Sequence, residues 1–461
     1  MELDLDHLEK LIPRYDVAGP RYTSYPTAPV WKEDFGDEAY GRALEQVAPG
    51  ADLSLYVHVP FCESLCHYCA CNKVITRKAE LPVRYLEVIA REIEATRQRL
   101  RGDPRAVELH WGGGTPTHLT PEQIRTLFDA ITSAIPLHDD AEVSIEVDPR
   151  VTTVDHMDVL AECGFNRISL GVQDFDARVQ ESVHRVQPVD QVEKLVVNSR
   201  ERGFRSINFD LIYGLPYQTE DSFSRTLDTV LDLAPDRIAL YSYAHVTWVA
   251  KQQRSFERSD LPEPARKLRI MLMAIRRFLE AGYVYIGMDH FARPEDDLSR
   301  ALADGRLYRN FMGYTIRAGG ELVGFGPSAI SELEDSYAQS QRGLGEWEQA
   351  VEERGLATLR GHRLSADDLA RRWVIQSIMC QGVVEASVYE ARFGEPFAKR
   401  YAKEIQRLAP MAEDGLIVVE ADGSLRVTSD GRLLVRNAAM AFDAYLEQQT
   451  RGDKPLFSKT V

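Results

Sequence analysis

Hydrophobic and polar positions between residues 53 and 241 form short alternating runs that predict β-strands separated by helices. The predicted strands cover residues 53–59, 107–111, 142–147, 167–172, 206–212 and 237–241. Helical patterns separate them at about residues 81–101, at 189–203 and after Thr219. Repeated strand–helix units predict a parallel sheet with right-handed crossovers. Periodicity does not decide whether this α/β sheet closes into a partial barrel or stays open.

One predicted helix start is unusually well marked. Thr120 stands at the N-cap position, Pro121 follows at the first helical position, and Gln123 lies three residues after the cap. A threonine cap with glutamine at this spacing forms a capping box, and proline is favoured at the first helical position. We therefore expect a helix to begin at Pro121.

The two ends of the chain have a different character. Residues 1–50 are rich in tyrosine and proline and are predicted to be irregular. From about residue 362 the pattern predicts helices, followed by two short apolar runs that flank Asp422-Gly423, a strong hairpin signal. We expect a winged-helix-like unit here. Residues 362–461 hold 14 basic and 14 acidic residues, so no excess of positive charge predicts DNA binding.

Composition narrows the class of protein. Apolar residues make up 44% and charged residues 27%, which is typical of a soluble globular protein. Lysine and arginine total 55 against 71 acidic residues, and the net charge of −16 disfavours general binding to nucleic acid or anionic membranes. No apolar run approaches the length of a membrane span, and the acidic N-terminus does not resemble a secretory signal. We therefore expect a cytoplasmic protein.

Length suggests several parts. A chain of 461 residues is long for one hydrophobic core and predicts a large catalytic domain with smaller additions. We expect an N-terminal extension over residues 1–50, a domain of strand–helix units with a C-terminal elaboration over 51–340, and a mostly helical domain over 341–461.

Cysteine spacing is the first specific chemical signal. Of six cysteines, four lie within ten residues: Cys62, Cys66, Cys69 and Cys71. Such crowding in one loop of a large chain indicates a metal or cluster site rather than a disulfide framework. The other two, Cys163 and Cys380, lie in apolar stretches and are predicted to be buried small side chains.

Three kinds of site are compatible with this loop. Cys62, Cys66 and Cys69 could hold three irons of a [4Fe–4S] cluster and leave the fourth iron open, the interpretation we favour. Zinc bound by three cysteines with His58 or His67 is a second possibility. A fully ligated electron-transfer cluster that also uses Cys71 is a third, although one residue between two ligands is a tight spacing.

The cysteine loop, placed after a first strand, resembles the signature of the radical S-adenosylmethionine superfamily. Gly112-Gly113-Gly114 after the second strand resembles the superfamily segment that binds the methionine amino group. The resemblance implies that the open iron chelates S-adenosylmethionine and that the reduced cluster cleaves it to methionine and a 5′-deoxyadenosyl radical. It also places Tyr68 against the adenine.

A closer resemblance is carried by five segments. They are Gly-Pro-Arg-Tyr-Thr-Ser-Tyr-Pro at 19–26, Tyr-Val-His-Val-Pro-Phe-Cys at 56–62, Cys-Ala-Cys-Asn-Lys at 69–73, Ser-Ile-Glu-Val-Asp-Pro-Arg at 144–150 and Asp-Leu-Ile-Tyr-Gly-Leu-Pro at 210–216. Together they resemble the oxygen-independent coproporphyrinogen III oxidase (dehydrogenase) family of haem biosynthesis. This resemblance implies a three-quarter barrel of six strand–helix units, here within residues 51–340, with N-terminal and C-terminal additions. It also implies that the N-terminal extension, residues 1–50, contacts the active site.

The family resemblance also implies two bound S-adenosylmethionine molecules. Contacts to the first would come from Tyr56, Tyr68, Gly113, Glu146 and Ile330, with Tyr56 and Glu146 as the catalytic candidates. Contacts to the second would come from Gly114, Thr115, Gln173, Arg185, Asp210 and Ala244. We expect Glu146 and Asp210 at strand ends, where barrel sites collect. By itself, Asp210 could equally cap a helix.

The implied substrate is coproporphyrinogen III, two of whose propionates would be converted to vinyl groups, giving protoporphyrinogen IX. An external electron donor and a final electron acceptor are then required, and the chain is expected to be a monomer. Arg21, His58 and Arg309 are candidates to bind substrate carboxylates. A related haem-binding chaperone is the alternative, but we expect it to lack both the 19–26 segment and the fourth cysteine.

One residue departs from the family pattern. Ala70 stands between Cys69 and Cys71, where the family is expected to have glycine. If the loop needs a positive φ at this position, alanine would cost about 1 kcal/mol.

Overall fold

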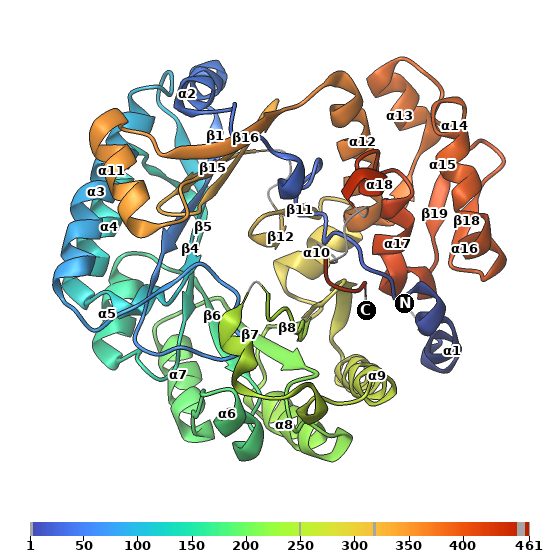
Figure 1. Ribbon diagram of the computed structural model, residues 1–461, viewed down its shortest axis with the longest axis horizontal. Helices are drawn as coiled ribbons and strands as arrows, with labels where there is room; N and C mark the ends of the chain where they lie inside the picture. The colour runs from blue at the N-terminus through green and yellow to red at the C-terminus, as the bar shows by residue number, and fades with distance from the viewer. Residues whose placement is uncertain (1–2, 249, 317–319, 450–456, 461) are drawn as a thin grey trace. The chain divides into compact units, whose positions relative to one another are not determined.

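A computed structural model describes residues 3–248, 250–316, 320–449 and 457–460 (Figure 1). The chain divides into two compact units. One comprises Lys32–Lys267 with Gly319–Arg363 and is called the barrel unit below. The other comprises Met1–Trp31, Leu268–Ala318 and Leu364–Val461 and is called the helical unit. Our functional division at residues 50 and 340 stays a prediction.

A curved parallel sheet forms the centre of the barrel unit. Its six predicted strands are β1 (Asp52–Val59), β4 (Arg105–Gly113), β5 (Leu137–Val147), β6 (Arg167–Gln173), β7 (Ser206–Tyr213) and β8 (Arg237–Ser242). They lie in this order and each pairs in parallel with the next. The predicted α/β fold, a partial barrel of six strand–helix units, is therefore confirmed.

Helices cover the outer side of this sheet (Figure 1). They are α3 (Glu80–Arg97), α4 (Pro121–Ala134), α5 (Val154–Glu162), α6 (Ala177–Ser182), α7 (Val189–Glu201) and α8 (Glu220–Leu233). The capping box predicted at Thr120 is present, and Thr219 caps α8 as expected. The first helix ends at Arg97, four residues earlier than predicted, and α7 ends at Glu201 rather than 203.

Within the central strands, apolar side chains lie on one face of the sheet and polar side chains lie on the other. In β1, Leu53, Leu55, Val57 and Val59 are fully buried. Side chains of a strand point alternately to its two faces, so Ser54, Tyr56 and His58 share the opposite face. The same alternation in β4 separates buried Leu109 and Trp111 from Glu108 and His110. The apolar face of β4 packs outside the sheet, where Trp111 contacts Phe165 in the loop between α5 and β6. Polar side chains are left on the inner face.

The sheet continues beyond the six predicted strands. β13 (Glu321–Phe325) adds to the free side of β1 in parallel, and β14 (Ile330–Leu333), β15 (Ser336–Ser340) and β16 (Thr358–Arg363) follow antiparallel. The remaining elements of this unit are α2 (Asp37–Gln46), β2 (Phe61–Cys62), β3 (Val74–Ile75), η2 (Pro116–His118), η3 (Lys251–Ser255), η4 (Arg258–Asp260) and α11 (Leu344–Arg354). The apolar run at 322–326 is thus a seventh parallel strand.

The prediction that residues 1–50 are irregular is wrong. They contain α1 (Leu5–Tyr15), capped by Asp4, as well as η1 (Ala28–Val30) and α2. Leu5, Leu8 and Ile12 are buried at spacings of three and four residues, which is the periodicity of an amphipathic helix. This helical periodicity extends over only eleven residues, and it lies next to the conspicuous tyrosine-rich and proline-rich segment.

The rest of the helical unit contains the predicted C-terminal hairpin. Strands β18 (Ile417–Val419) and β19 (Leu425–Val427) pair antiparallel, and β17 (Val383–Val384) adds a third strand. The other elements are α9 (Pro264–Glu280, whose first turn belongs to the barrel unit), β9 (Val284–Gly287), β10 (His290–Ala292), α10 (Asp297–Ala303), β11 (Tyr308–Asn310), β12 (Gly313–Thr315), α12 (Ala366–Gln376), η5 (Ser377–Gln381), α13 (Ala386–Phe393), α14 (Phe397–Arg400), α15 (Ala402–Arg407), α16 (Ala409–Glu413), η6 (Asp430–Leu434), α17 (Val435–Met440) and α18 (Leu446–Gln449). Cys380 in this unit and Cys163 in the barrel unit are both buried, as predicted. In the described part of the chain, no helix combines the length and the apolar character that a membrane crossing needs.

Candidate active site

The four clustered cysteines lie in the loop that leaves the carboxyl end of β1. The loop closes on its own start, because Val74 N donates to Pro60 O at 2.7 Å and Thr76 N donates to Cys62 O at 2.9 Å. Cys66 is buried, Cys62 and Cys69 are half-buried, and Cys71 is exposed. Strand ends of this kind are where barrel enzymes collect their active sites.

Neighbouring segments hold the loop in place. His67 N donates to Val183 O at 2.9 Å, and His184 Nδ1 lies 3.0 Å from Leu65 O. The ring of Tyr68 packs against an apolar cluster made by Val179, Val183, Ile212, Leu215, Tyr243 and Phe256. The cysteine loop is therefore anchored to the end of α6 and to the strands beyond it.

The pKa values of the loop cysteines differ. A hydrogen bond from Cys71 and the positive charge of Lys73 lower the pKa of the Cys69 thiol to about 6, against the effect of burial. The same hydrogen bond raises the pKa of Cys71 well above its ordinary value. Burial raises the pKa of Cys62 to about 11. Cys69 thus has thiolate character before any metal binds, whereas Cys62 must release its proton to become a ligand.

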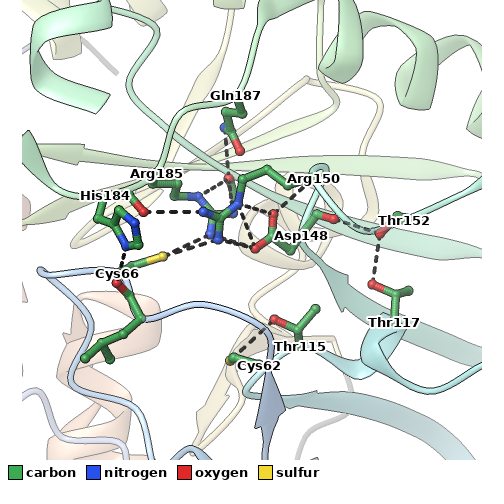
Figure 2. Close-up of polar contacts among 12 residues, drawn as sticks. Cys62, Cys66, Thr115, Thr117, Asp148, Arg150, Thr152, His184, Arg185 and Gln187 are labelled. Atoms are coloured by element: carbon green, nitrogen blue, oxygen red, sulfur yellow. Dashed lines mark hydrogen bonds and ion pairs between the residues drawn. The ribbon is translucent and has the colours of Figure 1, made fainter. Parts of the chain in front are cut away.

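Side-chain donors point at two of these sulfurs (Figure 2). Thr115 Oγ1 donates to Cys62 Sγ at 3.5 Å, and Arg150 Nη2 donates to Cys66 Sγ at 3.4 Å. Arg185 Nη1 lies 3.6 Å from the same Cys66 sulfur. Donors of this type stabilise negative charge on sulfur, so the surroundings of Cys62 and Cys66 fit ligands of an iron–sulfur cluster.

The histidines near the loop are engaged elsewhere. His58 Nε2 donates to Asn72 O at 2.9 Å, and Nδ1 lies 3.0 Å from Tyr56 OH, so both ring nitrogens are used. The His67 ring stacks on His184, and its Nδ1 lies 3.3 Å from Ser182 O. Among the described residues no group of three or more His, Cys, Asp and Glu side chains is arranged to hold a single metal ion. These histidine contacts favour the cluster over a Cys3His zinc site.

The first set of predicted contacts gathers on the inner face of the sheet. The Tyr56 and His110 rings stack with centroids 6.0 Å apart, and His110 Nε2 lies 3.5 Å from Glu146 Oε1. Gly113 N donates to Glu146 Oε2 at 3.3 Å. Partial burial raises the pKa of Glu146, but the bonds from His110 and Gly113 outweigh it and leave the pKa below its ordinary value. Glu146 therefore carries a negative charge near neutral pH.

The triglycine segment depends on the absence of side chains. Gly113 has a φ of +113°, and a Cβ there would lie 2.6 Å from the His58 ring. A Cβ on Gly114 would lie 2.7 Å from Pro60 and Phe61 backbone atoms. The backbone N–H groups of Gly114 and Thr115 donate to Val59 O and Phe61 O, both at 2.8 Å. The segment is thereby packed against the start of the cysteine loop.

Three of the residues predicted to contact the second S-adenosylmethionine molecule lie on β6, on β7 and after β8. Gln173 is the last residue of β6 and has a φ of +67°. Asp210 lies inside β7 rather than at its end, and it accepts bonds from Ser169 Oγ at 3.0 Å and Asn208 Nδ2 at 2.9 Å. Burial and the charge of Glu146 raise the pKa of Asp210 to about 7. Asp210 therefore does not cap a helix.

Arg185 is already engaged with protein groups. Its Nη1 lies 3.1 Å from Asp148 Oδ2, and its Nε and Nη2 donate to Gly171 O at 3.2 and 2.7 Å. A ligand carboxylate would share this guanidinium with Asp148.

Ala244 and Ile330 are the remaining predicted S-adenosylmethionine contacts. Ala244 follows β8, and its carbonyl accepts a bond from Gln253. Ile330 is the first residue of β14. A Cβ added to Gly324 would lie 2.6 Å from the Ile330 carbonyl oxygen, and Gly324 is the strand partner of Tyr56.

Ala70 adopts no strained backbone. The non-glycine residues with positive φ in the described chain are Tyr22, Gln173, His184, Tyr217, Ala234, Met288 and Ser328. Ala70 is outside this group, so the conditional cost of alanine at this position does not arise.

Several residues of the site were given no role by the sequence reasoning. His110 bridges Tyr56 and Glu146, Asp148 and Arg150 lie beside Cys66, and Gln253 supports the loop from after β8. The alternation of β4 could have pointed to His110, because it shares a face with Glu108. The other contacts cross long sequence separations and have no local signal.

Comparisons with known proteins agree with this geometry. Residues 56–230 match the Radical SAM superfamily, and residues 364–434 match the HemN C-terminal domain. The chain is 46% identical to oxygen-independent coproporphyrinogen III oxidase of Escherichia coli strain K12, over 98% of each chain. It is 45% identical to the Pseudomonas aeruginosa protein of the same name, over 96% of each.

A solved structure gives the same result. It carries the description "Coproporphyrinogen III oxidase (HemN) from Escherichia coli is a Radical SAM enzyme". Its TM-score is 0.91 at 44% identity, covering 96% of this chain and 99% of that one. Fold and site thus define a radical S-adenosylmethionine enzyme, a class that uses a [4Fe–4S] cluster and S-adenosylmethionine. Within that class, the chain belongs to the oxygen-independent coproporphyrinogen III oxidase family.

Proposed function

We propose that this protein oxidatively decarboxylates two propionate side chains of coproporphyrinogen III to vinyl groups and so produces protoporphyrinogen IX. The observation that carries the proposal is the cysteine loop at the end of β1, in a chain 46% identical over 98% of its length to the E. coli oxidase. The segment at 19–26 and the fourth cysteine, both expected to be absent from a haem chaperone of this superfamily, support the oxidase over that alternative.

The cluster would be held by Cys62, Cys66 and Cys69. A cluster held there would supply the electron for the radical chemistry of this enzyme class. The protein's own part is to hold the reacting groups and to exclude water and oxygen. Cys71 would remain a thiol, because its proton is held by the bond to Cys69.

The proposal includes two bound S-adenosylmethionine molecules. The first would meet Tyr56, Tyr68, Gly113, Glu146 and Ile330. An ionised Glu146 would attract a cationic part of that molecule, either its amino group or its sulfonium. The second would meet Gly114, Thr115, Gln173, Arg185, Asp210 and Ala244.

Arg309 in the helical unit is a candidate for a substrate carboxylate. It is 3% exposed, and its Nη1 has no hydrogen-bond partner in the described residues. Burial, followed by the charges of Arg309 and Arg21, lowers the pKa of His290 to about 3. A buried cation with an unused donor is expected to bind an anion. His58 is a weaker candidate, because both its nitrogens are engaged.

The remaining expectations belong to the same proposal. We expect an external electron donor and a final electron acceptor, a cytoplasmic monomer, and no nucleic-acid partner. The net charge of −16 supports the last of these.

An anaerobic assay tests the proposal. Reconstituted protein is mixed with coproporphyrinogen III, dithionite and S-adenosylmethionine, and vinyl products and 5′-deoxyadenosine are measured. We expect both to form, and neither to form in Cys62→Ser protein. Cleavage of S-adenosylmethionine without any vinyl product, combined with tight haem binding, would instead support the chaperone.

A further inference from the structure

Three side-chain donors converge on the sulfurs of Cys62 and Cys66 in the barrel unit. Thr115 Oγ1 lies 3.5 Å from Cys62 Sγ. Arg150 Nη2 and Arg185 Nη1 lie 3.4 and 3.6 Å from Cys66 Sγ. The two arginines come from different elements, one after β5 and the other after α6, so their meeting at one sulfur is a product of the fold (Figure 2).

Asp148 holds both guanidinium groups in position. Arg150 Nη2 donates to Asp148 Oδ2 at 2.6 Å and Arg150 Nε donates to Oδ1 at 3.0 Å, while Arg185 Nη1 donates to Oδ2 at 3.1 Å. The Asp148 side chain is 8% exposed. Although burial raises the pKa of Asp148, the two arginines lower it to about 2, so the carboxylate stays charged.

The backbone around Arg185 gives it a fixed direction. His184 follows the end of α6 with a φ of +55°, and its Nδ1 lies 3.0 Å from Leu65 O in the cysteine loop. Nε and Nη2 of Arg185 both donate to Gly171 O. A Cβ on Gly171 would lie 2.8 Å from Arg185 Nη2, so this close approach needs glycine. Arg185 is 7% exposed and is therefore little screened by solvent.

We propose that Arg150 and Arg185, positioned by Asp148, donate N–H···S hydrogen bonds to the Cys66 ligand and raise the reduction potential of the cluster. This inference rests on the cluster of the proposed function. Two cations and one carboxylate leave one net positive charge beside the Cys66 sulfur. Reduction adds one electron to the cluster, and donors and positive charge stabilise that added negative charge. Arg150 and Arg185 would thus act on the cluster through the Cys66 sulfur, without contacting the reacting atoms.

Arg150 offers the sharper test, because it is not among the predicted S-adenosylmethionine contacts. Arg150→Gln removes the charge, and Arg150→Lys keeps the charge but loses the planar guanidinium. Anaerobic redox titration followed by electron paramagnetic resonance measures the potential, and iron and sulfide analysis measures cluster content. For Arg150→Gln we expect full cluster content and about tenfold less favourable one-electron reduction, a potential lower by ~59 mV. Arg150→Lys should fall between this variant and the unmodified protein.

Arg202→Gln is the matched control. Arg202 pairs with Asp158 through Nε at 2.8 Å and Nη2 at 2.7 Å, the same type of charged contact as Arg150 with Asp148. Arg202 follows the end of α7, before β7 begins, which is the end of the barrel opposite to the cysteine loop. Its loss should leave the potential unchanged.

Each outcome is decisive. An unchanged potential in both Arg150 variants with full clusters overturns the inference and leaves the proposed function standing. Folded Arg150 variants that both fail to bind iron also overturn it, because the role would then be cluster assembly. Unmodified protein that never forms a [4Fe–4S] cluster refutes the proposed function itself.

Discussion

The side-chain amide of Gln253 donates a 3.1 Å hydrogen bond to the backbone carbonyl of Tyr68, 185 residues earlier in the chain. The same nitrogen lies 3.1 Å from Ala244 O, and Gln253 Oε1 accepts a bond from Val246 N at 2.6 Å. Gln253 is only 1% exposed. One buried amide thus joins the cysteine loop to the segment after β8.

We predict that Gln253→Leu weakens S-adenosylmethionine binding about tenfold. The substitution removes the hydrogen-bond partner of Tyr68 O, Ala244 O and Val246 N, and it frees the loop that carries Tyr68. Isothermal titration of the reconstituted protein with S-adenosylmethionine measures the effect. Gln349→Leu is the control, because Gln349 is exposed on α11 and donates to Glu353 on the same helix. Equal affinity in both variants would contradict the role of Gln253.

The three predicted iron ligands should be individually essential. Cys62→Ser, Cys66→Ser and Cys69→Ser should each abolish cluster assembly and S-adenosylmethionine cleavage, because a hydroxyl is a poor replacement for a soft thiolate. Iron content, the visible absorption spectrum and 5′-deoxyadenosine yield measure this. A full cluster with normal turnover in any one of these variants would remove that cysteine from the ligand set.

Cys71→Ser should behave differently. Cys71 is exposed and is not counted as a ligand, so the cluster should still assemble. Serine at this position keeps a hydroxyl that can donate to Cys69. Cys71→Ala instead removes the donor that lowers the Cys69 pKa to about 6, so this variant should slow reconstitution near neutral pH. The rate of iron uptake against pH tests this. Complete loss of the cluster would instead make Cys71 a fourth ligand.

Much of the barrel and the cysteine loop could be predicted from sequence, because both have local signals. Alternation located all six central strands, and the Thr120 capping box located the start of α4. The contacts that organise the site are not local. Arg185 meets Cys66 across 119 residues and Gln253 meets Tyr68 across 185, so only the folded chain brings them together. The expectation of Asp210 at a strand end is wrong, because β7 runs three residues past it to Tyr213.

Glu146 gives a prediction about the first S-adenosylmethionine molecule. Glu146→Gln removes the charge that pairs with His110 while keeping the size of the side chain. We expect reductive cleavage of S-adenosylmethionine to fall at least tenfold, even without porphyrinogen, and the iron content to stay unchanged. Glu162→Gln is the control, since Glu162 is exposed and pairs with Arg125 on the outer helices. Wild-type cleavage by the Glu146 variant would refute its assignment.

A buried carboxyl on α3 predicts how stability depends on pH. Glu92 accepts bonds from Gly326 N at 2.8 Å and from Trp347 Nε1 at 3.2 Å, and it is 3% exposed. Burial raises its pKa from 4.5 to about 7, although these bonds oppose the shift. Between those two values the folded chain holds a proton that the unfolded chain releases.

The free energy of unfolding should therefore fall as pH rises from about 5 to 7, and the contribution of Glu92 should level off above that. Glu92→Gln cannot ionise, so the stability of this variant relative to the unmodified protein should improve with pH. A shift from 4.5 to about 7 corresponds to a change on the order of 3 kcal/mol between pH 5 and 8. Urea unfolding at a series of pH values measures the difference. Glu94→Gln, on the exposed side of the same helix, is the control variant. If the Glu92→Gln difference did not change with pH, Glu92 would have to titrate near its ordinary pKa, and burial beside Trp347 would not be controlling its ionisation.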